Sequence, residues 1–255
     1  MSRSDLKSNR IGECFTTKEE LGGYEIIIVD YRDANNILVQ FQDKYKEIVP
    51  TTYRDCKKGS VVNPYHPSVY GVGYIGVGKY CDNKEISIEW RDMLRRGYDK
   101  ELKLREPTYK DVFVNKEFHY LQNYGFWREQ NYYEIEREQM CLDKDILIKG
   151  NKEYAPDKCI FVPKRINNLF INSKTVRGSY PIGVHYDKRY NKYIARCNTS
   201  NNRKYLGCYN TPEEAFLAYK EFKEAYIKEV ANEYRNRIPK ELYDAMYKWV
   251  VEIDD

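Results

Sequence analysis

The chain has 255 residues, of which 42% are hydrophobic and 32% charged, and its formal net charge is +4. This composition excludes wholesale disorder, and the length predicts two domains or three small ones. The seven cysteines are odd in number and form no CxxC pair, so neither a disulfide framework nor a zinc ribbon is expected. No apolar leader and no apolar run of about 18 residues is present, which predicts a cytoplasmic protein without a membrane partner.

Short apolar stretches fill residues 11–63 and predict strands at 24–30, 36–41 and 47–49. Glycine and asparagine residues between these stretches indicate turns. The spacing is typical of a small, tightly wound barrel, and we expect residues 1–64 to form an SH3-like β-barrel domain.

Residues 70–176 mix helical and extended patterns and predict an α+β domain. Apolar periodicity predicts a helix over 88–97 that ends at Gly97, and a second helix over 116–127. A short strand is expected at 112–114, and the apolar run 159–162 leads into a short helix.

A glycine-rich stretch, residues 71–78, fits the pattern G-x-G-x-x-G. A dinucleotide site would also require a βαβ unit and an acidic partner for the ribose, and neither is present in the pattern that follows. We therefore expect a tight glycine turn or hairpin rather than a nucleotide site.

The last segment, 177–255, predicts a three-stranded antiparallel sheet packed on a long helix. Strands are expected at 182–188, 192–199 and 203–209, with hairpin turns at Asn191 and Ser200-Asn-Asn202. Thr211 is a suitable N-cap, followed by Pro212 and two glutamates that favour a helix start. A final amphipathic helix is predicted over 240–250, and we expect residues 178–255 to fold alone.

Charge is distributed unevenly across this last segment. Residues 178–210 contain six basic residues and one acid, or +5, whereas helix 211–233 contains three basic residues and six acids, or −3. Period-two alternation predicts that one sheet face presents Lys192, Ile194, Arg196, Asn198, Arg203 and Tyr205, while Tyr193, Ala195, Cys197, Lys204 and Leu206 point toward the helix. Such an outer face has side chains suited to phosphates and base edges, although a merely solvated face would have the same composition.

The motifs Tyr180-Pro-Ile-Gly-Val-His185, Arg203-Lys-Tyr-Leu-Gly207 and Tyr209-Asn-Thr-Pro-Glu-Glu-Ala215 carry a resemblance. They resemble the APETALA-type DNA-binding domain of plant ethylene-response factors over about 55 residues. The resemblance implies double-stranded DNA binding by Ile182, His185, Lys192, Arg196, Asn198, Arg203 and Tyr205. The family has arginine, glutamate and tryptophan where this chain has Ile182, Arg196 and Tyr205, so DNA binding is expected without the plant sequence preference.

Residues 90–98 and the motifs Leu142-Asp-Lys-Asp145, Asn151, Tyr154-Ala-Pro-Asp-Lys-Cys159 and Ile166-Asn167 resemble phage-encoded HNH-nuclease-like proteins, many of which also carry an APETALA-type domain. The resemblance implies catalytic candidates at Asp143, Lys144, Asp145, Asn151 and Asn167. The histidine that activates water in HNH sites would fall at Lys144, and a protonated lysine cannot act as that base. The carboxylates either hold a metal or cap turns, and we expect the second.

These observations predict a modular double-stranded DNA-binding protein of phage or mobile-element type. No cofactor is expected, and Mg²⁺ would be required only if the chain were an active HNH homing endonuclease, which is the main alternative. A protein-binding inhibitor or adaptor that reuses these domains is a further alternative. Neither the DNA target nor the oligomeric state follows from the sequence.

Overall fold

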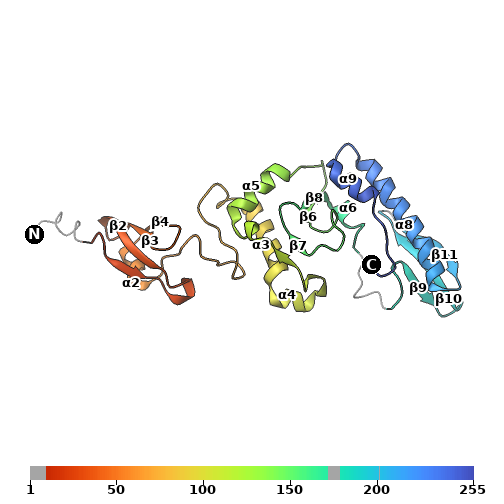
Figure 1. Ribbon diagram of the computed structural model, residues 1–255, viewed down its shortest axis with the longest axis horizontal. Helices are drawn as coiled ribbons and strands as arrows, with labels where there is room; N and C mark the ends of the chain where they lie inside the picture. The colour runs from red at the N-terminus through yellow and green to blue at the C-terminus, as the bar shows by residue number, and fades with distance from the viewer. Residues whose placement is uncertain (1–9, 172–178, 201) are drawn as a thin grey trace, which may run out of the picture. The chain divides into compact units, whose positions relative to one another are not determined.

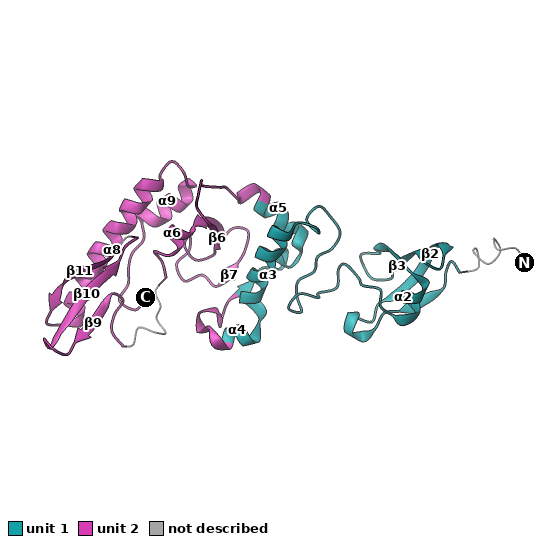
Figure 2. Ribbon diagram, turned by 180° about the vertical axis from the view of Figure 1, so that it is seen from behind, with its two compact units in different colours: residues 1–103, 113–128 teal, residues 104–112, 129–255 magenta. Residues whose placement is uncertain are grey.

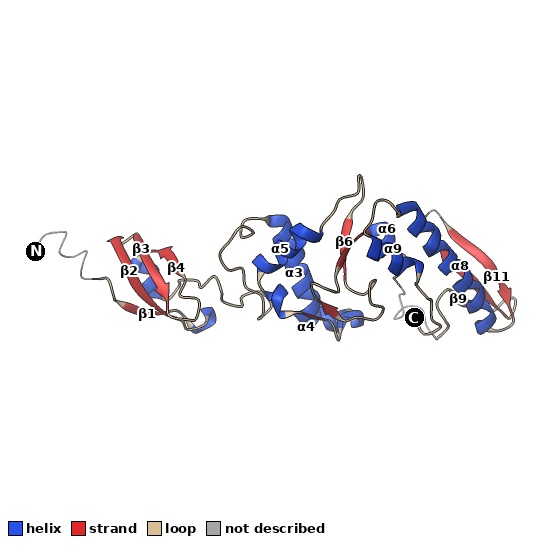
Figure 3. Ribbon diagram, turned by 45° about the horizontal axis from the view of Figure 1, so that its top comes forward, coloured by secondary structure: helices blue, strands red, loops and turns tan. Residues whose placement is uncertain are grey.

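The computed structural model describes residues 10–171, 179–200 and 202–255 (Figure 1). Contacts divide the chain into two compact units, Met1–Lys103 with Phe113–Arg128, and Leu104–Val112 with Glu129–Asp255 (Figure 2). The fold is mixed α+β, as predicted (Figure 3). None of the helices in the described ranges combines the length and the apolar character needed to cross a lipid bilayer.

The N-terminal sheet is an antiparallel meander in the order β1-β2-β3-β4. Its strands are β1 (Cys14–Thr16), β2 (Glu25–Asp33), β3 (Asn36–Phe41) and β4 (Ile48–Thr51), followed by helix α2 (Tyr53–Lys58). Alternate residues of β2 and β3 are buried, which is the period of a sheet with one covered face. The core of this sheet consists of Ile26, Ile28, Ile37, Val39, Phe41, Cys56 and Val61.

The closed barrel expected for residues 1–64 is not found. Within the described ranges β1 pairs only with β2, and β4 pairs only with β3, so the sheet is open. Pro50 in β4 lies opposite Leu38 and has no N–H to donate to a further strand. Proline is typical of an edge strand, which is the position that β4 occupies.

Three helices and short connecting elements follow the N-terminal sheet and α2. They are α3 (Lys84–Tyr98), α4 (Lys100–Arg105), a 3-10 turn (Pro107–Tyr109), β5 (Phe113–Val114), a second 3-10 turn (Lys116–His119) and α5 (Leu121–Asn131). Gly97 was expected to end the first helix, and this is wrong because it lies buried inside α3. A Cβ at Gly97 would come within 2.9 Å of Val114 Cγ2, so the glycine permits close packing rather than a helix stop.

The glycine-rich stretch before α3 forms a tight turn, as predicted. Val69 and Gly73 pair as an isolated antiparallel bridge. Gly71 and Gly76 have φ angles of +74° and +66°, which glycine adopts at no steric cost.

The second unit contains two separate sheets. Strand β6 (Met140–Asp143) pairs antiparallel with β8 (Ile160–Pro163), which leads into α6 (Lys164–Asn167); β7 (Glu153–Tyr154) lies between them in the chain. The C-terminal sheet has the order β11-β10-β9, formed by β9 (Val184–Asp187), β10 (Lys192–Asn198) and β11 (Arg203–Tyr209). Helices α8 (Pro212–Tyr234) and α9 (Lys240–Tyr247) complete the unit.

Helix α8 begins as its sequence predicts. Thr211 Oγ1 accepts the N–H of Glu214, and the Glu214 carboxylate accepts the N–H of Thr211, which together make a capping box. The final helix is shorter than expected and ends at Tyr247, before Trp249. Of the two predicted hairpin turns, Asn191 has the expected positive φ of 49°, whereas Asn201 lies outside the described residues.

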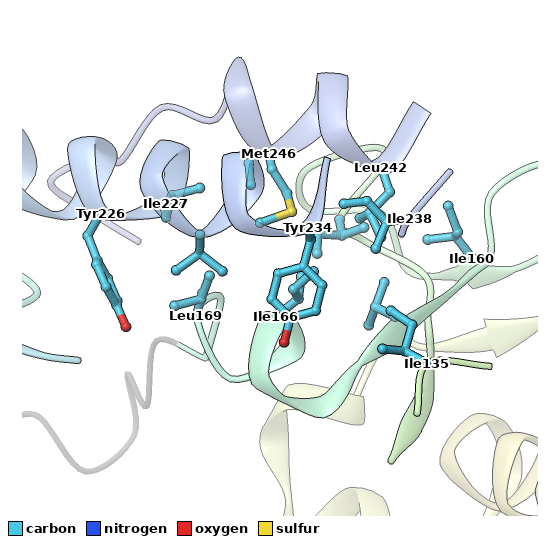
Figure 4. Close-up of a cluster of buried hydrophobic side chains, with 14 residues drawn as sticks. Ile135, Ile160, Ile166, Leu169, Tyr226, Ile227, Tyr234, Ile238, Leu242 and Met246 are labelled. Atoms are coloured by element: carbon cyan, nitrogen blue, oxygen red, sulfur yellow. The ribbon is translucent and has the colours of Figure 1, made fainter. Parts of the chain in front are cut away.

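Helix α8 contributes to two hydrophobic cores. Its first half packs Ala215, Phe216 and Tyr219 against the C-terminal sheet. Its second half belongs to a core that also contains residues from β8, α6 and α9 (Figure 4). The members of that core are Ile135, Ile146, Ile160, Val162, Ile166, Leu169, Tyr226, Ile227, Val230, Ala231, Tyr234, Ile238, Leu242 and Met246. The predicted boundary between residues 176 and 177 lies outside the described ranges, and the elements on its two sides share this core.

Candidate nucleic-acid interface

The register of the C-terminal sheet brings the sequence-predicted DNA-facing residues onto one face. Arg196 lies opposite Tyr205, and Asn198 lies opposite Arg203. On the other side of β10, Ile194 pairs with His185, and Lys192 with Asp187. Directly opposed residues share a face of a sheet, so these side chains form the outer face.

The inner face also follows the predicted alternation. Ala195 and Cys197 are fully buried in the core with α8, and Tyr193 and Leu206 pack against it. Lys204 Nζ lies 4.7 Å from the ring centroid of Phe222 in α8, which places Lys204 on the same side. The predicted assignment of residues to the two faces of β10 and to Arg203–Leu206 is therefore confirmed.

A bulge interrupts the ladder between β10 and β11. Ala195 pairs with Gly207 and Arg196 pairs with Tyr205, so Leu206 is an extra residue. Gly207 has a φ of +138°, and a Cβ at this position would lie 2.6 Å from the Tyr209 hydroxyl. The bulge adds Leu206 to the inner core while Tyr205 remains outside, where it is 56% exposed.

The outer face has one acid, Asp187 opposite Lys192, while its two arginines have no acidic partner among the described residues. Burial lowers the pKa of His185, and the nearby charges of Arg196 and Arg203 lower it further, while Asp187 opposes the shift. His185 is therefore in the field of both arginines and favours its neutral form.

Three of the six acidic residues of α8 have partners that do not belong to this face. Glu214 caps its own helix, Glu224 pairs with Lys220, and Glu233 pairs with Arg165 at 2.6 Å. The sheet therefore has a basic outer face and an acidic helix behind it.

One position of the outer face differs from the sequence prediction. Ile182, a position implied by the family resemblance, is half-buried and packs against the core with α8, so it does not belong to the outer face. Lys188, Arg189 and Tyr190 in the β9–β10 turn are exposed, and Tyr190 is 70% exposed. Lys188 and Arg189 add positive charge next to the outer face, so this turn belongs to the candidate interface.

The nuclease-like candidates Asp143, Lys144, Asp145 and Asn151 lie together in one turn. Asp143 Oδ1 accepts the N–H groups of Asp145 and Ile146 at 2.9 and 2.7 Å. Asn151 Nδ2 donates to the carbonyls of Lys144 and Glu153 at 2.6 and 2.7 Å, and so closes the turn. Asn167 lies in α6, and the described residues show no side-chain hydrogen bond between it and this turn.

Lys144 is buried where the resemblance would place the catalytic histidine. Its Nζ donates to Asp145 Oδ2 at 2.8 Å and to the Asn151 carbonyl at 3.0 Å. Lys144 therefore forms an ion pair with Asp145 and a hydrogen bond that closes the turn, and its amine group is occupied by these two acceptors. Burial and the charge of Asp145 raise the pKa of Asp143 to about 6, against its backbone donors. Within residues 10–171, 179–200 and 202–255, no three His, Cys, Asp or Glu side chains are arranged to hold a metal ion.

Comparisons of this chain with protein-family models, with curated proteins and with solved structures find no match.

Proposed function

We propose that this chain binds double-stranded DNA through the outer face of the sheet β11-β10-β9. The observation that carries the proposal is that Arg196 and Arg203 lie on one sheet face without an ion-pair partner among the described residues. Cationic groups of this kind neutralise phosphates, and arginine also binds guanine edges in a bidentate manner.

Other side chains of the face have complementary roles in the proposal. Asn198 has the donor and acceptor needed for an adenine edge, and Lys192 and His185 are further donors to phosphate. Tyr205 is opposite Arg196 and exposed, so its ring is available to bases or sugars. The acidic helix α8 on the other side of the sheet would be repelled by the phosphates, so the basic outer face would turn toward the duplex.

In this proposal the turn at residues 143–151 is structural. Its resemblance to HNH nucleases supports a phage or mobile-element origin, but Lys144 is engaged in an ion pair with Asp145 and a hydrogen bond to the Asn151 carbonyl. A water nucleophile would therefore lack the general base that HNH chemistry requires.

The test is a binding selection on randomised duplex DNA with the purified full chain, with and without Mg²⁺. We expect enrichment of duplexes in both conditions, with affinity that falls steeply with salt. The absence of any duplex binding at low salt would contradict the proposal and favour a protein partner for this face. Cleaved products that appear only with Mg²⁺ would favour the endonuclease.

A further inference from the structure

A second candidate site lies in the first unit. A hollow of about 310 Å³ is lined by four tyrosines, Tyr24, Tyr45, Tyr65 and Tyr74, and by two charged residues, Asp43 and Lys44. The rings come from the loops of the N-terminal sheet and from the segment before α3, so only the folded chain assembles them.

The tyrosine rings are held in place before any ligand arrives. Tyr45 and Tyr65 stack with centroids 4.0 Å apart and an angle of 10°. Tyr74 stacks in turn on Tyr120, with centroids 5.0 Å apart. Burial and a hydrogen bond with Tyr45 raise the pKa of Tyr74 to about 12, so this ring stays neutral at physiological pH. A preformed hollow loses little conformational entropy on binding.

Asp43 brings a fixed negative charge to the hollow. Its Oδ1 accepts the N–H groups of Tyr45 and Lys46 at 3.0 and 3.1 Å, and its Oδ2 accepts Asn63 Nδ2 at 2.8 Å. A carboxylate has about four acceptor positions, so one remains for a ligand. After burial, the charge of Asp43 is the next cause that raises the pKa of Tyr24, which shows that its field reaches this ring.

Lys44 shows which kind of ligand the rings accept. Its Nζ lies 4.7 Å from the centroid of Tyr45, within the distance of about 6 Å at which a cation is attracted to an aromatic face. The same ring also stacks with Tyr65. The chain therefore already places a cation of its own at the hollow.

We propose that this hollow binds a lysine or arginine side chain from a basic peptide segment of a partner protein, with Lys44 as an internal competitor. Aromatic faces and a carboxylate both attract a cation, whereas Asp43 would repel a phosphate group. The proposal is independent of DNA binding by the C-terminal sheet.

The experiment uses the full chain and 11-residue glycine-serine peptides with one central lysine, arginine, norleucine or glutamate, titrated by NMR chemical-shift perturbation. We expect the lysine and arginine peptides to shift the resonances of Tyr45, Tyr65 and Tyr74, and the norleucine and glutamate peptides to leave them unchanged. Asp43→Asn should lower the affinity for the cationic peptides by about five- to tenfold, because the substitution removes the negative charge and keeps a hydrogen-bond acceptor. Glu47→Gln, a neighbouring acid outside the hollow, is the matched control.

Lys44→Ala gives the opposite and more specific prediction. Removing the competitor should increase the affinity for the lysine peptide by about two- to fivefold, which corresponds to the free energy of one exposed cation–π contact. Lys46→Ala has the same charge change but contacts Gln42 instead, and it should have no effect. Unfolding midpoints equal to the parent establish that each variant is folded, and Lys44 is exposed enough for its removal to be harmless.

Three results would overturn the proposal. Equal shifts with the norleucine peptide would make the hollow a simple apolar site. Binding of oligothymidine at these tyrosines, without binding of cationic peptides, would make it a base-stacking site. Unchanged or weaker binding by Lys44→Ala would exclude the competition that the geometry implies.

Discussion

Arg196 and Arg203 differ from Arg165 and Arg237, two other arginines of the second unit, in the partners that they have. Arg165 pairs with Glu233, and Arg237 lies 3.8 Å from Glu138, so the charges of both are partly compensated. Arg196 instead lies opposite Tyr205, and Arg203 opposite Asn198. At the scale of single residues, the candidate function therefore depends on cations that the fold leaves available.

Replacing both of these cations is the first prediction. Arg196→Ala/Arg203→Ala should lower affinity for the selected duplex by roughly 1–3 kcal/mol for each bidentate hydrogen-bonded pair with a base that the substitutions remove. The slope of log K against log salt should also flatten by about 0.9 for each phosphate that is no longer neutralised. Fluorescence anisotropy over a salt series measures both quantities. Arg32→Ala/Arg54→Ala removes the same charge from β2 and α2 of the first unit and should leave the curves unchanged. Equal curves for the two double variants would show that the face is only solvated.

A second prediction concerns pH. The pKa of His185 is lowered in the free chain, and a nearby phosphate would favour the imidazolium, so duplex binding should take up a proton. Affinity should then rise as the pH falls from about 7.5 to 5.5, by at most tenfold per unit for one proton. His185→Gln should flatten this rise in anisotropy titrations. The effect of pH on folding has the opposite sign. Because the pKa of His185 is lower in the folded chain than in the unfolded chain, the unfolded chain binds more protons below about pH 6.5. The contribution of His185 to the free energy of unfolding is therefore lost as the pH falls below that value.

A third prediction is that the turn at residues 143–151 does not support efficient DNA cleavage. Loss of a general base costs about 10²–10⁴-fold in rate, and Lys144, in the place of the HNH histidine, is bound to Asp145 and to the Asn151 carbonyl. The purified chain should leave a supercoiled plasmid that carries the selected duplex sequence intact in Mg²⁺ or Mn²⁺. Robust nicking that disappears in Asp143→Ala/Asp145→Ala would contradict this and make the endonuclease the better function.

At the scale of elements, α8 connects the C-terminal sheet with the β6–β8 hairpin. It has 23 residues and is therefore about 34 Å long, which is long enough to serve both cores. Its start was predictable because Thr211, Pro212 and Glu214 are local signals. Its second partner was not, because nothing in the periodicity of a helix states which distant strand will cover its apolar face.

A fourth prediction compares two aliphatic residues of α8. Ile227 is 1% exposed in the shared core, whereas Leu217 is 61% exposed. Ile227→Ala should reduce the free energy of unfolding by about 2–5 kcal/mol, and Leu217→Ala should change it by less than about 0.5 kcal/mol. Urea denaturation followed by circular dichroism measures both. Similar small decreases in the two variants would indicate that the shared core contributes little.

At the scale of the whole molecule, local patterns predicted elements better than their assembly. The strands at 36–41 and 203–209 were predicted at their observed bounds, since alternation and flanking turns define them. The prediction of a closed barrel was wrong because closure depends on pairing between β1 and β4, and the sequence of neither strand indicates such a pairing. Gly97 was misread for the same kind of reason, because its contact with Val114 is distant in sequence.

The candidate sites show the same division. Alternation assigned Lys192, Arg196 and Asn198 to one face correctly, since a strand fixes the side of each residue. The role of Lys144 could be suspected from its neighbours, but its bond to the Asn151 carbonyl required the closed turn. The tyrosine hollow could not be predicted at all, because its rings come together only through tertiary packing.

A fifth prediction revises the smallest autonomous fragment. Residues 178–255 were expected to fold alone, but that fragment would expose the faces of α8 and α9 that β8 and α6 cover. A fragment of residues 129–255 should unfold cooperatively and bind the duplex. The fragment of residues 178–255 should unfold at lower urea concentration and bind a hydrophobic dye. Equal stability of the two fragments would support autonomous folding of residues 178–255.

The strand order β11-β10-β9 has a consequence for how a duplex could be read. The major groove of B-DNA is about 12 Å wide and accommodates a two-stranded ribbon, while strands of a sheet lie about 4.8 Å apart. Three strands abreast are too broad to enter such a groove fully. The cross-strand pairs of β10 and β11, Arg196 with Tyr205 and Asn198 with Arg203, would then occupy its floor. His185 on β9 would lie at the edge of the groove, beside the sugar-phosphate backbone.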